Sequence, residues 1–306
     1  MAQPKAKQIW LDGKVVASLQ KALKQANHKS IIKLGSGTFK QAGVINKNGI
    51  TIEGSNGTKM LGKTVHGKAT FVIKGNNTTI KNIECSNINV KDGNGACVRL
   101  EGKNLKLQNV YFHDSQQGLL TGGSPGYIKI FDSKFERLGK AGMAHGIYVG
   151  GGTLIIKNST FLSSKDQGHE IKSRATETRI ENSVIASLDG NDSRLVDIPN
   201  GGKLVITDSL LGQGPKSVNW NLIGFGHEKY WYPENSITLI GNIFLLERDK
   251  GNLVLDVKDN KAKLNITQNA FIGRINEGDF DDTNFYFEDR ESAGLEAYPT
   301  LPDITK

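Results

Sequence analysis

The sequence predicts an all-β protein built as a single-domain parallel β-helix, and three observations support this prediction. A unit made of an apolar residue, a polar stretch with Asn or Asp, and a return to apolar residues recurs eight times, at steps of about 25 residues. The units are rich in β-branched residues, and glycine and asparagine separate them. No helical pattern lies between the units, and they lack the Leu-rich consensus of leucine-rich repeats. A solenoid of short strands is therefore expected.

The repeat can be followed through most of the chain. The unit at 156–161 reads Ile-Lys-Asn-Ser-Thr-Phe, and steps between units range from 23 to 33 residues. Alternating apolar side chains are expected to point into each coil, while the Asn/Asp-Ser pair turns the chain toward the next strand. Each coil then buries its interior against its neighbours. The first apolar residues of the eight units are Ile80, Leu107, Ile130, Ile156, Ile180, Ile206, Leu239 and Ile266.

The domain organisation follows from this repeat. All 306 residues are expected to form one elongated domain, because a repeat protein of this size is commonly one continuous body. A capping helix of about three turns is expected within about 12–30, where apolar residues from Val15 to Ala26 follow near-helical spacing. Coils are expected at about 31–274, and a capping tail that wraps the C-terminal end at about 275–306. Such caps cover strand edges that invite association.

The longest step in the repeat contains extra chain at 212–235. Long loops on a rigid repeat often carry binding residues, and aromatic side chains there can form a platform for sugar rings. Packing against the coil is an equally good explanation of the same aromatics. The candidate substrate-binding residues in this loop are Trp220, His227, Tyr230 and Trp231.

The net charge of +8 favours an anionic partner, because a positive surface attracts anions over long range. Nucleic acid, a membrane surface and an acidic polysaccharide all match this sign. No Lys/Arg-rich run or recognition-helix pattern supports nucleic acid, so an acidic polysaccharide is the preferred partner. No apolar run approaches the roughly 20 residues that a membrane-spanning helix needs.

The cysteines leave the compartment open. Cys85 and Cys97 lack a metal-binding spacing, and they form either one disulfide or two buried thiols. A periplasmic or secreted location fits an acidic polysaccharide substrate. The first residues lack an apolar signal core, so in that case the sequence is expected to be a mature or trimmed form.

A second ladder of segments between the repeat units contains a dense set of ionisable residues. Tyr148, Lys172 and Asp197 lie 24 and 25 positions apart, so one coil per step stacks them in a column. If Ile147, Ile171 and Val196 face inward, the period of two also turns Glu170 and Arg174 outward, and adjacent coils lie about 4.8 Å apart. His145, His169 and Arg194 would then share a neighbouring column. An ordinary ion-pair ladder is the plain explanation, but the number and variety of groups favour a functional site.

Proton abstraction beside a carboxylate suits this set of side chains. Removing the C5 proton of a uronic acid needs a group that neutralises the carboxylate, a base with a pKa near neutral, and an acid for the leaving oxygen. Nearby Arg174 and Arg194 would lower the pKa of Lys172, which could then act as the base. Histidine or tyrosine could also take this role.

The repeat and cap resemble the pectate-lyase-like right-handed β-helix superfamily over about residues 30–275. Locally, Glu-Ile-Lys-Ser at 170–173 and Thr-Arg-Ile-Glu-Asn-Ser at 178–183 are similar to the alginate lyase and chondroitinase B family. That similarity implies that Lys172 is the base and that Arg194, 22 residues later, assists as acid. The family also binds the carboxylate through calcium, and of its ligands only Glu170 can be suggested here.

Other patterns of the superfamily differ. The Asp-Pro-His motif of bacterial mannuronan epimerases and the paired calcium-binding aspartates of pectate lyases are not found. The segments around His145, His169 and Asn200 most resemble a group of bacterial β-helix proteins of unassigned function. Asn200 is also a candidate substrate-binding residue.

Three functions are compatible with the sequence. The preferred one is a polysaccharide lyase acting on a uronate-containing polymer, with calcium as a possible cofactor. The alternatives are a glycoside hydrolase that uses Glu170 and Asp197 as its carboxyl pair, and a glycan-binding β-helix without catalysis. The catalytic candidates are Lys172, Arg194, His145, Tyr148 and His169, and the substrate-binding candidates are Arg174, Asp197, Glu170, Asn200, Trp220, His227, Tyr230 and Trp231.

Overall fold

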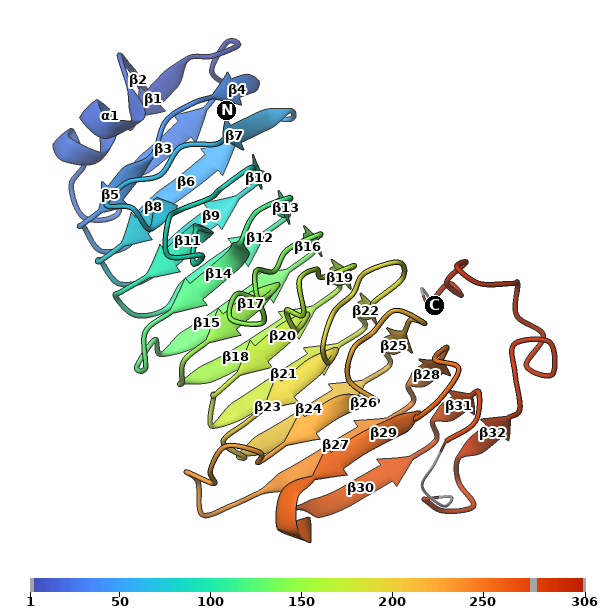
Figure 1. Cartoon of the computed structure of the whole chain (residues 1–306). Helices are drawn as coiled ribbons and strands as arrows, with labels where there is room; N and C mark the ends of the chain where they lie inside the picture. The colour runs from blue at the N-terminus through green and yellow to red at the C-terminus, as the bar shows by residue number, and fades with distance from the viewer. Residues whose placement is uncertain (1–2, 276–279, 305–306) are drawn as a thin grey trace.

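A computed structural model describes residues 3–275 and 280–304, and it contains three long sheets that wind around a common interior (Figure 1). Each coil of the chain contributes one strand to each sheet, so strands of consecutive coils pair in parallel, as β18 does with β21. The all-β fold expected from the repeat is confirmed.

The strands are assigned to the sheets in spatial order. The twelve-stranded sheet contains β2 (Lys14–Val16), β1 (Ile9–Leu11), β3 (Ile31–Leu34), β6 (Thr51–Gly54), β9 (Thr78–Lys81), β12 (Leu105–Gln108), β15 (Tyr127–Phe131), β18 (Thr153–Lys157), β21 (Glu177–Glu181), β24 (Lys203–Thr207), β27 (Ser236–Ile240) and β30 (Lys263–Thr267). The eleven-stranded sheet contains β32 (Phe285–Phe287), β31 (Ala270–Ile272), β28 (Ile243–Leu246), β25 (Leu210–Gln213), β22 (Val184–Ala186), β19 (Thr160–Leu162), β16 (Lys134–Glu136), β13 (Tyr111–His113), β10 (Glu84–Ser86), β7 (Thr58–Leu61) and β4 (Gly37–Phe39). The nine-stranded sheet contains β29 (Leu253–Val257), β26 (Asn221–Phe225), β23 (Val196–Ile198), β20 (Ile171–Ser173), β17 (Ile147–Val149), β14 (Gln117–Thr121), β11 (Ala96–Leu100), β8 (Ala69–Ile73) and β5 (Gly43–Ile45). The helical elements are α1 (Leu19–Gln25) and the short 3₁₀ turn η1 (Lys258–Asn260).

The repeat unit of the sequence stacks in register along the twelve-stranded sheet. Ile156 lies opposite Ile130 on one side and Ile180 on the other, and all three side chains are buried. The Asn/Asp position that follows has a left-handed backbone, as in Asn158 (φ 50°), which turns the chain toward the next sheet. The following serine is buried, and Ser133 Oγ accepts a hydrogen bond from the Val110 N–H of the preceding coil. The unit therefore supplies both a core residue and a turn.

The helix of the N-terminal cap is shorter than the sequence pattern predicted. Residues 12–18 do not join the helix, because Asp12 and Gly13 have positive φ and form the turn of a β1–β2 hairpin. The helix α1 then begins after Ser18, whose hydroxyl accepts a hydrogen bond from Lys21 N–H, and it buries Leu19, Ala22 and Leu23. The cap thus combines a hairpin with a helix of about two turns.

The C-terminal tail covers more than the end of the solenoid. Of the predicted tail at 275–306, residues 275 and 280–304 are described. β32 adds to β31, and Phe280 packs on Phe271 at the end of the interior. Beyond it, apolar side chains including Leu295 and Leu301 pack on the outer face of the eleven-stranded sheet.

Cys85 and Cys97 are joined by a disulfide, which resolves the alternative left open by the sequence. Both residues are buried inside the coil. Among the described residues, no helix is long and apolar enough to cross a membrane.

Candidate functional site

The outer face of the nine-stranded sheet carries the predicted column. Tyr148 on β17 lies opposite Lys172 on β20, and Lys172 lies opposite Asp197 on β23. The column continues through Gly224 on β26 to Asp256 on β29. Because side chains alternate along a strand, the residues that flank the column, such as Ile147 and Val149 on β17, are buried and point into the core, which leaves this column facing outward.

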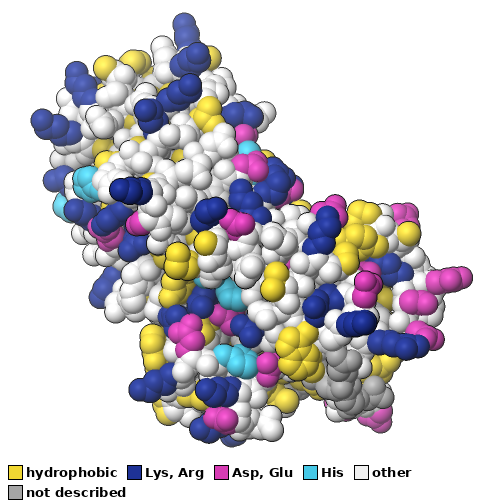
Figure 2. Space-filling view, in the orientation of Figure 1, with side chains coloured by type: hydrophobic (Ala, Val, Ile, Leu, Met, Phe, Trp, Pro, Cys, Tyr) yellow, Lys and Arg dark blue, Asp and Glu magenta, His cyan; other side chains and the backbone are white. Residues whose placement is uncertain are grey.

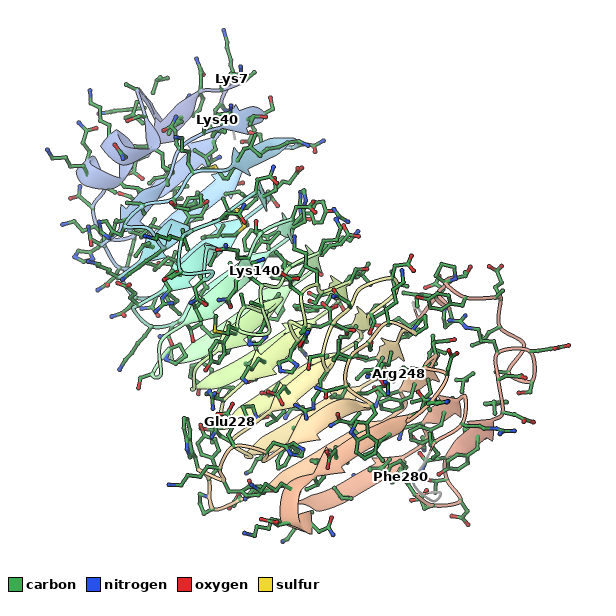
Figure 3. The ribbon with its side chains drawn as sticks, in the orientation of Figure 1. Lys7, Lys40, Lys140, Glu228, Arg248 and Phe280 are labelled. Carbon is green, nitrogen blue, oxygen red and sulfur yellow. A yellow bond between two sulfur atoms is a disulfide. The ribbon has the colours of Figure 1, made fainter. Side chains whose placement is uncertain are left out.

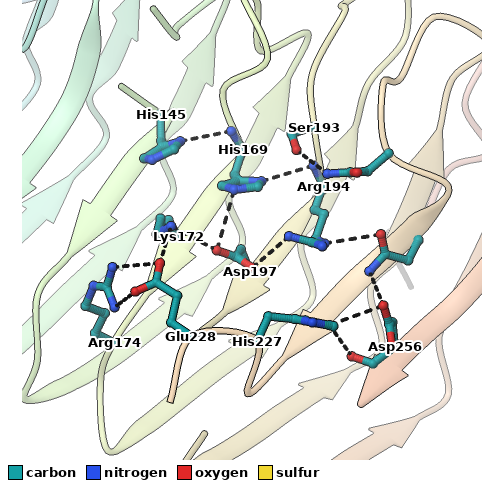
Figure 4. A network of polar contacts seen from close by, with 12 residues as sticks. His145, His169, Lys172, Arg174, Ser193, Arg194, Asp197, His227, Glu228 and Asp256 are labelled. Carbon is teal, nitrogen blue, oxygen red and sulfur yellow. Dashed lines mark hydrogen bonds and ion pairs between the residues drawn. The ribbon is translucent and has the colours of Figure 1, made fainter. Parts of the chain in front are cut away.

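Asp197 is the centre of this site although it is only 3% exposed. Lys172 Nζ lies 3.2 Å from Asp197 Oδ2, and Arg194 Nη1 lies 3.3 Å from Oδ1 (Figure 4). His169 Nε2 lies 3.5 Å from Oδ2. Figure 2 shows histidine, basic and acidic side chains gathered on this face of the molecule. We refer to this group as the Asp197 cluster, and it consists of His145, Tyr148, His169, Lys172, Arg174, Arg194, Asp197, Asn221 and Glu228.

Two stacked histidines form one side of the cluster, with ring centroids 4.9 Å apart. His145 Nδ1 is 3.1 Å from the backbone N–H of His169, and His169 Nδ1 is 3.1 Å from the N–H of Arg194. A backbone N–H can only donate, so both Nδ1 atoms accept and both rings carry their proton on Nε2. Burial lowers the pKa of His169 to about 3 and that of His145 well below its ordinary value. Both are therefore neutral hydrogen-bond donors at neutral pH.

Arg194 is held across the face of β26 by residues that the sequence did not single out. Its Nε donates to Asn221 Oδ1 at 3.2 Å, and Asn221 Nδ2 donates to Asp256 Oδ2 at 3.4 Å. The guanidinium lies over Gly224, where an added Cβ would come within 2.6 Å of Arg194 Nε. A glycine in an outward column opposite ionisable residues is a signal that could have identified this place.

Arg174 forms the opposite side of the cluster. Its Nε donates to Tyr148 Oη at 2.6 Å, and its Nη1 donates to Asn200 Oδ1. Its Nη2 donates to Glu228 Oε1 at 2.9 Å, and the same oxygen lies 3.2 Å from Lys172 Nζ. The Arg174 guanidinium holds the pKa of Glu228 below its ordinary value. Sequence reasoning missed Glu228, because it lies on a loop 56 residues after Lys172.

The aromatic loop residues divide between packing and exposure. Tyr230 lies against Gly226, and its hydroxyl donates to the Lys258 carbonyl at 2.6 Å, so it packs on the coil. His227 Nε2 lies 3.2 Å from Asp256 Oδ2, next to the Asp197 cluster. Trp231 is 53% exposed, with the Arg174 guanidinium 5.6 Å from its ring, and Trp220 is 48% exposed.

Glu170 does not face outward as the sequence period suggested. It is 1% exposed, and its carboxyl accepts hydrogen bonds from Ser164 N–H at 2.5 Å and Ser164 Oγ at 2.8 Å. The alternation fails because Glu170 precedes β20, in a bend where the period of two does not apply. Burial raises the pKa of this carboxyl well above its ordinary value. The hydrolase pair of Glu170 with Asp197 is therefore wrong, since the two carboxyls do not face the same space.

The same observation bears on calcium. Glu170 was the suggested ligand, and it is buried, with its carboxyl bonded to Ser164. The described residues contain no group of three or more His, Cys, Asp or Glu side chains placed to hold a metal ion. Glu170 therefore does not fit the role of a calcium ligand.

A cavity of about 780 Å³ lies elsewhere, between the C-terminal tail and the last coils, where Leu246, Ile272 and Tyr298 are among its lining residues. It does not include residues of the Asp197 cluster. The candidate site lies on the outward face of the nine-stranded sheet, away from this cavity.

Comparison with known proteins supports the fold. A family model described as a right handed beta helix region matches residues 31–185. Among curated proteins, no sequence matches the chain. An alginate lyase from Paenibacillus sp. str. FPU-7 has a similar structure, with 16% identity, coverage of 88% of this chain and 94% of that chain, and a TM-score of 0.60. The pectate lyase Pel9A also has 16% identity, with coverage of 83% and 74% and a TM-score of 0.58. The similarity to right-handed β-helix proteins is confirmed, and at these identities it shows the fold alone.

Proposed function

We propose that this chain, which belongs to the right-handed β-helix family, has the active site of a polysaccharide lyase at the Asp197 cluster. The proposed substrate is an acidic, uronate-containing polysaccharide, and the reaction is β-elimination. The alginate and pectate lyases with similar folds make this reaction class a reasonable candidate.

The reaction defines what the site must supply. A base takes the C5 proton, the C4–O bond breaks, a C4–C5 double bond forms, and an acid protonates the leaving oxygen. A cation beside the uronate carboxylate stabilises the charge that develops when the C5 proton leaves. The atoms and electrons of this elimination balance without an oxidant, a reductant or a metal ion.

The observation that carries the proposal is the convergence of Tyr148, Lys172 and Arg174 at one place on the outer face. Lys172 Nζ lies 5.9 Å from the Tyr148 ring centroid, and Arg174 Nε donates to the Tyr148 hydroxyl oxygen. Because the Tyr148 oxygen accepts this hydrogen bond, its own O–H proton can be donated to a different acceptor. In this arrangement Lys172 is the base that removes the C5 proton, Tyr148 protonates the leaving oxygen, and Arg174 binds the carboxylate.

Arg194, Asp197 and the two histidines position these groups. An arginine keeps its protons over the whole accessible pH range, so Arg194 is better suited to hold Asp197 than to donate a proton. Asp197 in turn fixes Lys172 at 3.2 Å. His169 directs its Nε2–H toward the same carboxylate, and His145 orients His169 through the backbone.

A glycan-binding function without catalysis is the second candidate. The exposed indole rings of Trp220 and Trp231 favour it, since each offers a face on which a sugar ring can stack. Binding without product formation on every acidic polymer would support this function over the lyase.

The proposed location is the periplasm or the extracellular space. The disulfide between Cys85 and Cys97 supports it, because such bonds persist mainly in oxidising compartments.

The test is to incubate the protein with polygalacturonate, alginate and hyaluronan and to follow the absorbance of the unsaturated product in the far ultraviolet. Lys172→Ala and Tyr148→Phe are expected to lower kcat by a factor of about 100 or more. Lys203→Ala is the matched control, because Lys203 pairs with Glu234 at the surface, outside the cluster. Full activity in both Lys172→Ala and Tyr148→Phe would refute the site assignment.

A further inference from the structure

The carboxylate of Glu228 lies where two basic side chains of the Asp197 cluster converge. Its Oε1 accepts from Arg174 Nη2 at 2.9 Å and lies 3.2 Å from Lys172 Nζ, and its Oε2 lies 2.5 Å from Arg174 Nη1. Two parallel contacts between a guanidinium and a carboxylate are the geometry with which proteins bind carboxylate ligands. We infer that the Arg174 guanidinium, with Lys172 beside it, forms a carboxylate-binding subsite, and that the side chain of Glu228 occupies it until a uronate carboxylate takes its place.

The two basic side chains belong to the rigid part of the molecule. The side chains of Lys172 and Arg174 are only 14% and 15% exposed. Lys172 is also held by Asp197, and Arg174 by Tyr148 and Asn200. Arg174 therefore keeps its position when the glutamate leaves, so the subsite is preformed.

Glu228 is held differently. It lies on the loop between β26 and β27 (Figure 3), and its side chain is 47% exposed. Water can hydrate the released carboxylate at this exposure, so the cost of its departure is small. The backbone beneath it is fixed, because Glu228 N–H donates to the Pro199 carbonyl at 3.0 Å. Rotation of one side chain is sufficient to open the subsite, and the loop does not have to move.

The surroundings indicate which carboxylate fits. Trp231 lies on the same loop and is exposed, with its ring 5.6 Å from the Arg174 guanidinium. A sugar ring can stack on this indole while a carboxylate on the sugar reaches Arg174. A hexuronate has both features, whereas a neutral hexose has no group that competes with Glu228. This inference deepens the proposed lyase function, because it gives the lyase a place for the charge of its substrate.

Glu228→Gln tests the inference, because it keeps the shape of the side chain and removes its charge. Titration calorimetry uses galacturonate and glucuronate, which have no bond for the lyase to cleave. We expect Glu228→Gln to bind them about threefold to tenfold more tightly than the unaltered protein does. Arg174→Ala is expected to abolish this binding. Glu234→Gln is the matched control, because Glu234 lies on the same loop and pairs with Lys203 at 2.7 Å, and its affinity is expected to be unchanged.

The outcomes separate this inference from the proposed function. Equal or weaker uronate binding by Glu228→Gln overturns the inference, even if the unaltered protein cleaves polyuronates. Tighter binding by Glu228→Gln supports it, even if no polymer is cleaved and the lyase proposal fails. Tighter binding of glucose as well would also overturn it, since a neutral sugar cannot replace the carboxylate.

Discussion

This protein has two clusters of ionisable side chains, each built from residues of consecutive coils. The two clusters differ in the exposure of their side chains and in the arrangement of their contacts. One is the Asp197 cluster on the nine-stranded sheet. The other lies on the eleven-stranded sheet, over β10, β13 and β16, and we refer to it as the Arg137 cluster. It consists of Glu84, Tyr111, His113, Asp114, Lys134, Glu136 and Arg137.

The Arg137 cluster is a surface network. Arg137 holds Asp114 with two contacts of 2.8 and 2.9 Å, and their side chains are 44% and 37% exposed. Arg137 also contacts Glu136, and Lys134 contacts the same carboxylate. Each charge has its counter-charge beside it at the solvent boundary, which is the arrangement of an ordinary ion-pair ladder.

The Asp197 cluster has a buried centre and directs several donors at one carboxylate. The side chain of Asp197 is 4% exposed, and it faces Lys172, Arg194 and His169. Gly224 leaves space for the Arg194 guanidinium, and backbone N–H groups fix the tautomers of both histidines. The density of charged residues is similar in both clusters, so density does not identify a site. Burial, fixed donor directions and a space made by glycine distinguish the Asp197 cluster.

The largest expected difference between the clusters is in stability. Asp197→Asn leaves Lys172 and Arg194 without their shared buried counter-charge, and we expect the free energy of unfolding to fall by about 3 to 5 kcal/mol. Asp114→Asn removes an exposed partner of Arg137, and we expect a loss of about 1 kcal/mol or less. Urea denaturation followed by circular dichroism measures both values. Equal losses would show that the burial of Asp197 has no energetic consequence.

The sequence predicted the coil period and the column because both depend on local alternation. Ile156 and its equivalents stack in the core, and Tyr148, Lys172 and Asp197 stack outside it, as the spacing required. Glu170 was placed wrongly because it lies in a bend, where alternation does not hold.

The parts that could not be predicted depend on contacts across coils. Glu228 reaches Lys172 from a loop whose path no periodic pattern describes. The Arg137 cluster was also not anticipated, because it forms through contacts between residues of successive coils, such as Arg137 with Asp114. The Asp12-Gly13 turn is different, because its sequence is a known hairpin signal that the helical spacing of the following residues obscured.

Two aspartates are expected to give pH dependences of opposite sign. Burial raises the pKa of Asp192 to about 7, whereas Arg137 lowers the pKa of Asp114. Between about pH 4 and 7 the folded protein therefore holds a proton on Asp192 that the unfolded chain releases, so stability falls as the pH rises through this window, by at most about 1.4 kcal/mol per pH unit. The contribution of Asp114 is present above about pH 4 and is lost as the pH falls further.

Asp192→Asn tests this sign, because it keeps the shape of a side chain that binds Ser187 and Ser217. The decline in unfolding free energy between pH 4 and 7 is expected to become shallower, with a remaining slope from Glu170, whose pKa is also raised by burial. The control is Asp189→Asn, an exposed position that pairs with Lys216, and its pH dependence is expected to match the unaltered protein. A slope that Asp192→Asn leaves unchanged would contradict the assignment.

The space over Gly224 gives a sharper test of the difference between the clusters. In Gly224→Ala the new methyl group would meet Arg194 Nε at 2.6 Å, so the guanidinium must move away from Asp197. If the lyase proposal holds, we expect kcat/KM on the polyuronate that is cleaved to fall about tenfold, which corresponds to about 1.4 kcal/mol. Gly212→Ala is the control, because its nearest contact would be an ordinary 3.6 Å and it lies on the eleven-stranded sheet. Equal activity of the two variants would mean that the position of Arg194 does not matter.

The smallest expected effect concerns the fixed tautomer of His169. In His169→Asn the side-chain oxygen can accept the Arg194 N–H as Nδ1 does, but the donor directed at Asp197 is lost. We expect a change of less than about 1 kcal/mol in the free energy of unfolding, since one net hydrogen bond is involved. In the unaltered protein, burial keeps the pKa of His169 near 3, so nitrogen NMR is expected to show a neutral ring protonated on Nε2 from pH 5 to 8. A His169 titration with a midpoint near 6.5 would show that the ring is free to take up a proton, and the Asp197 cluster would then resemble an ordinary surface network.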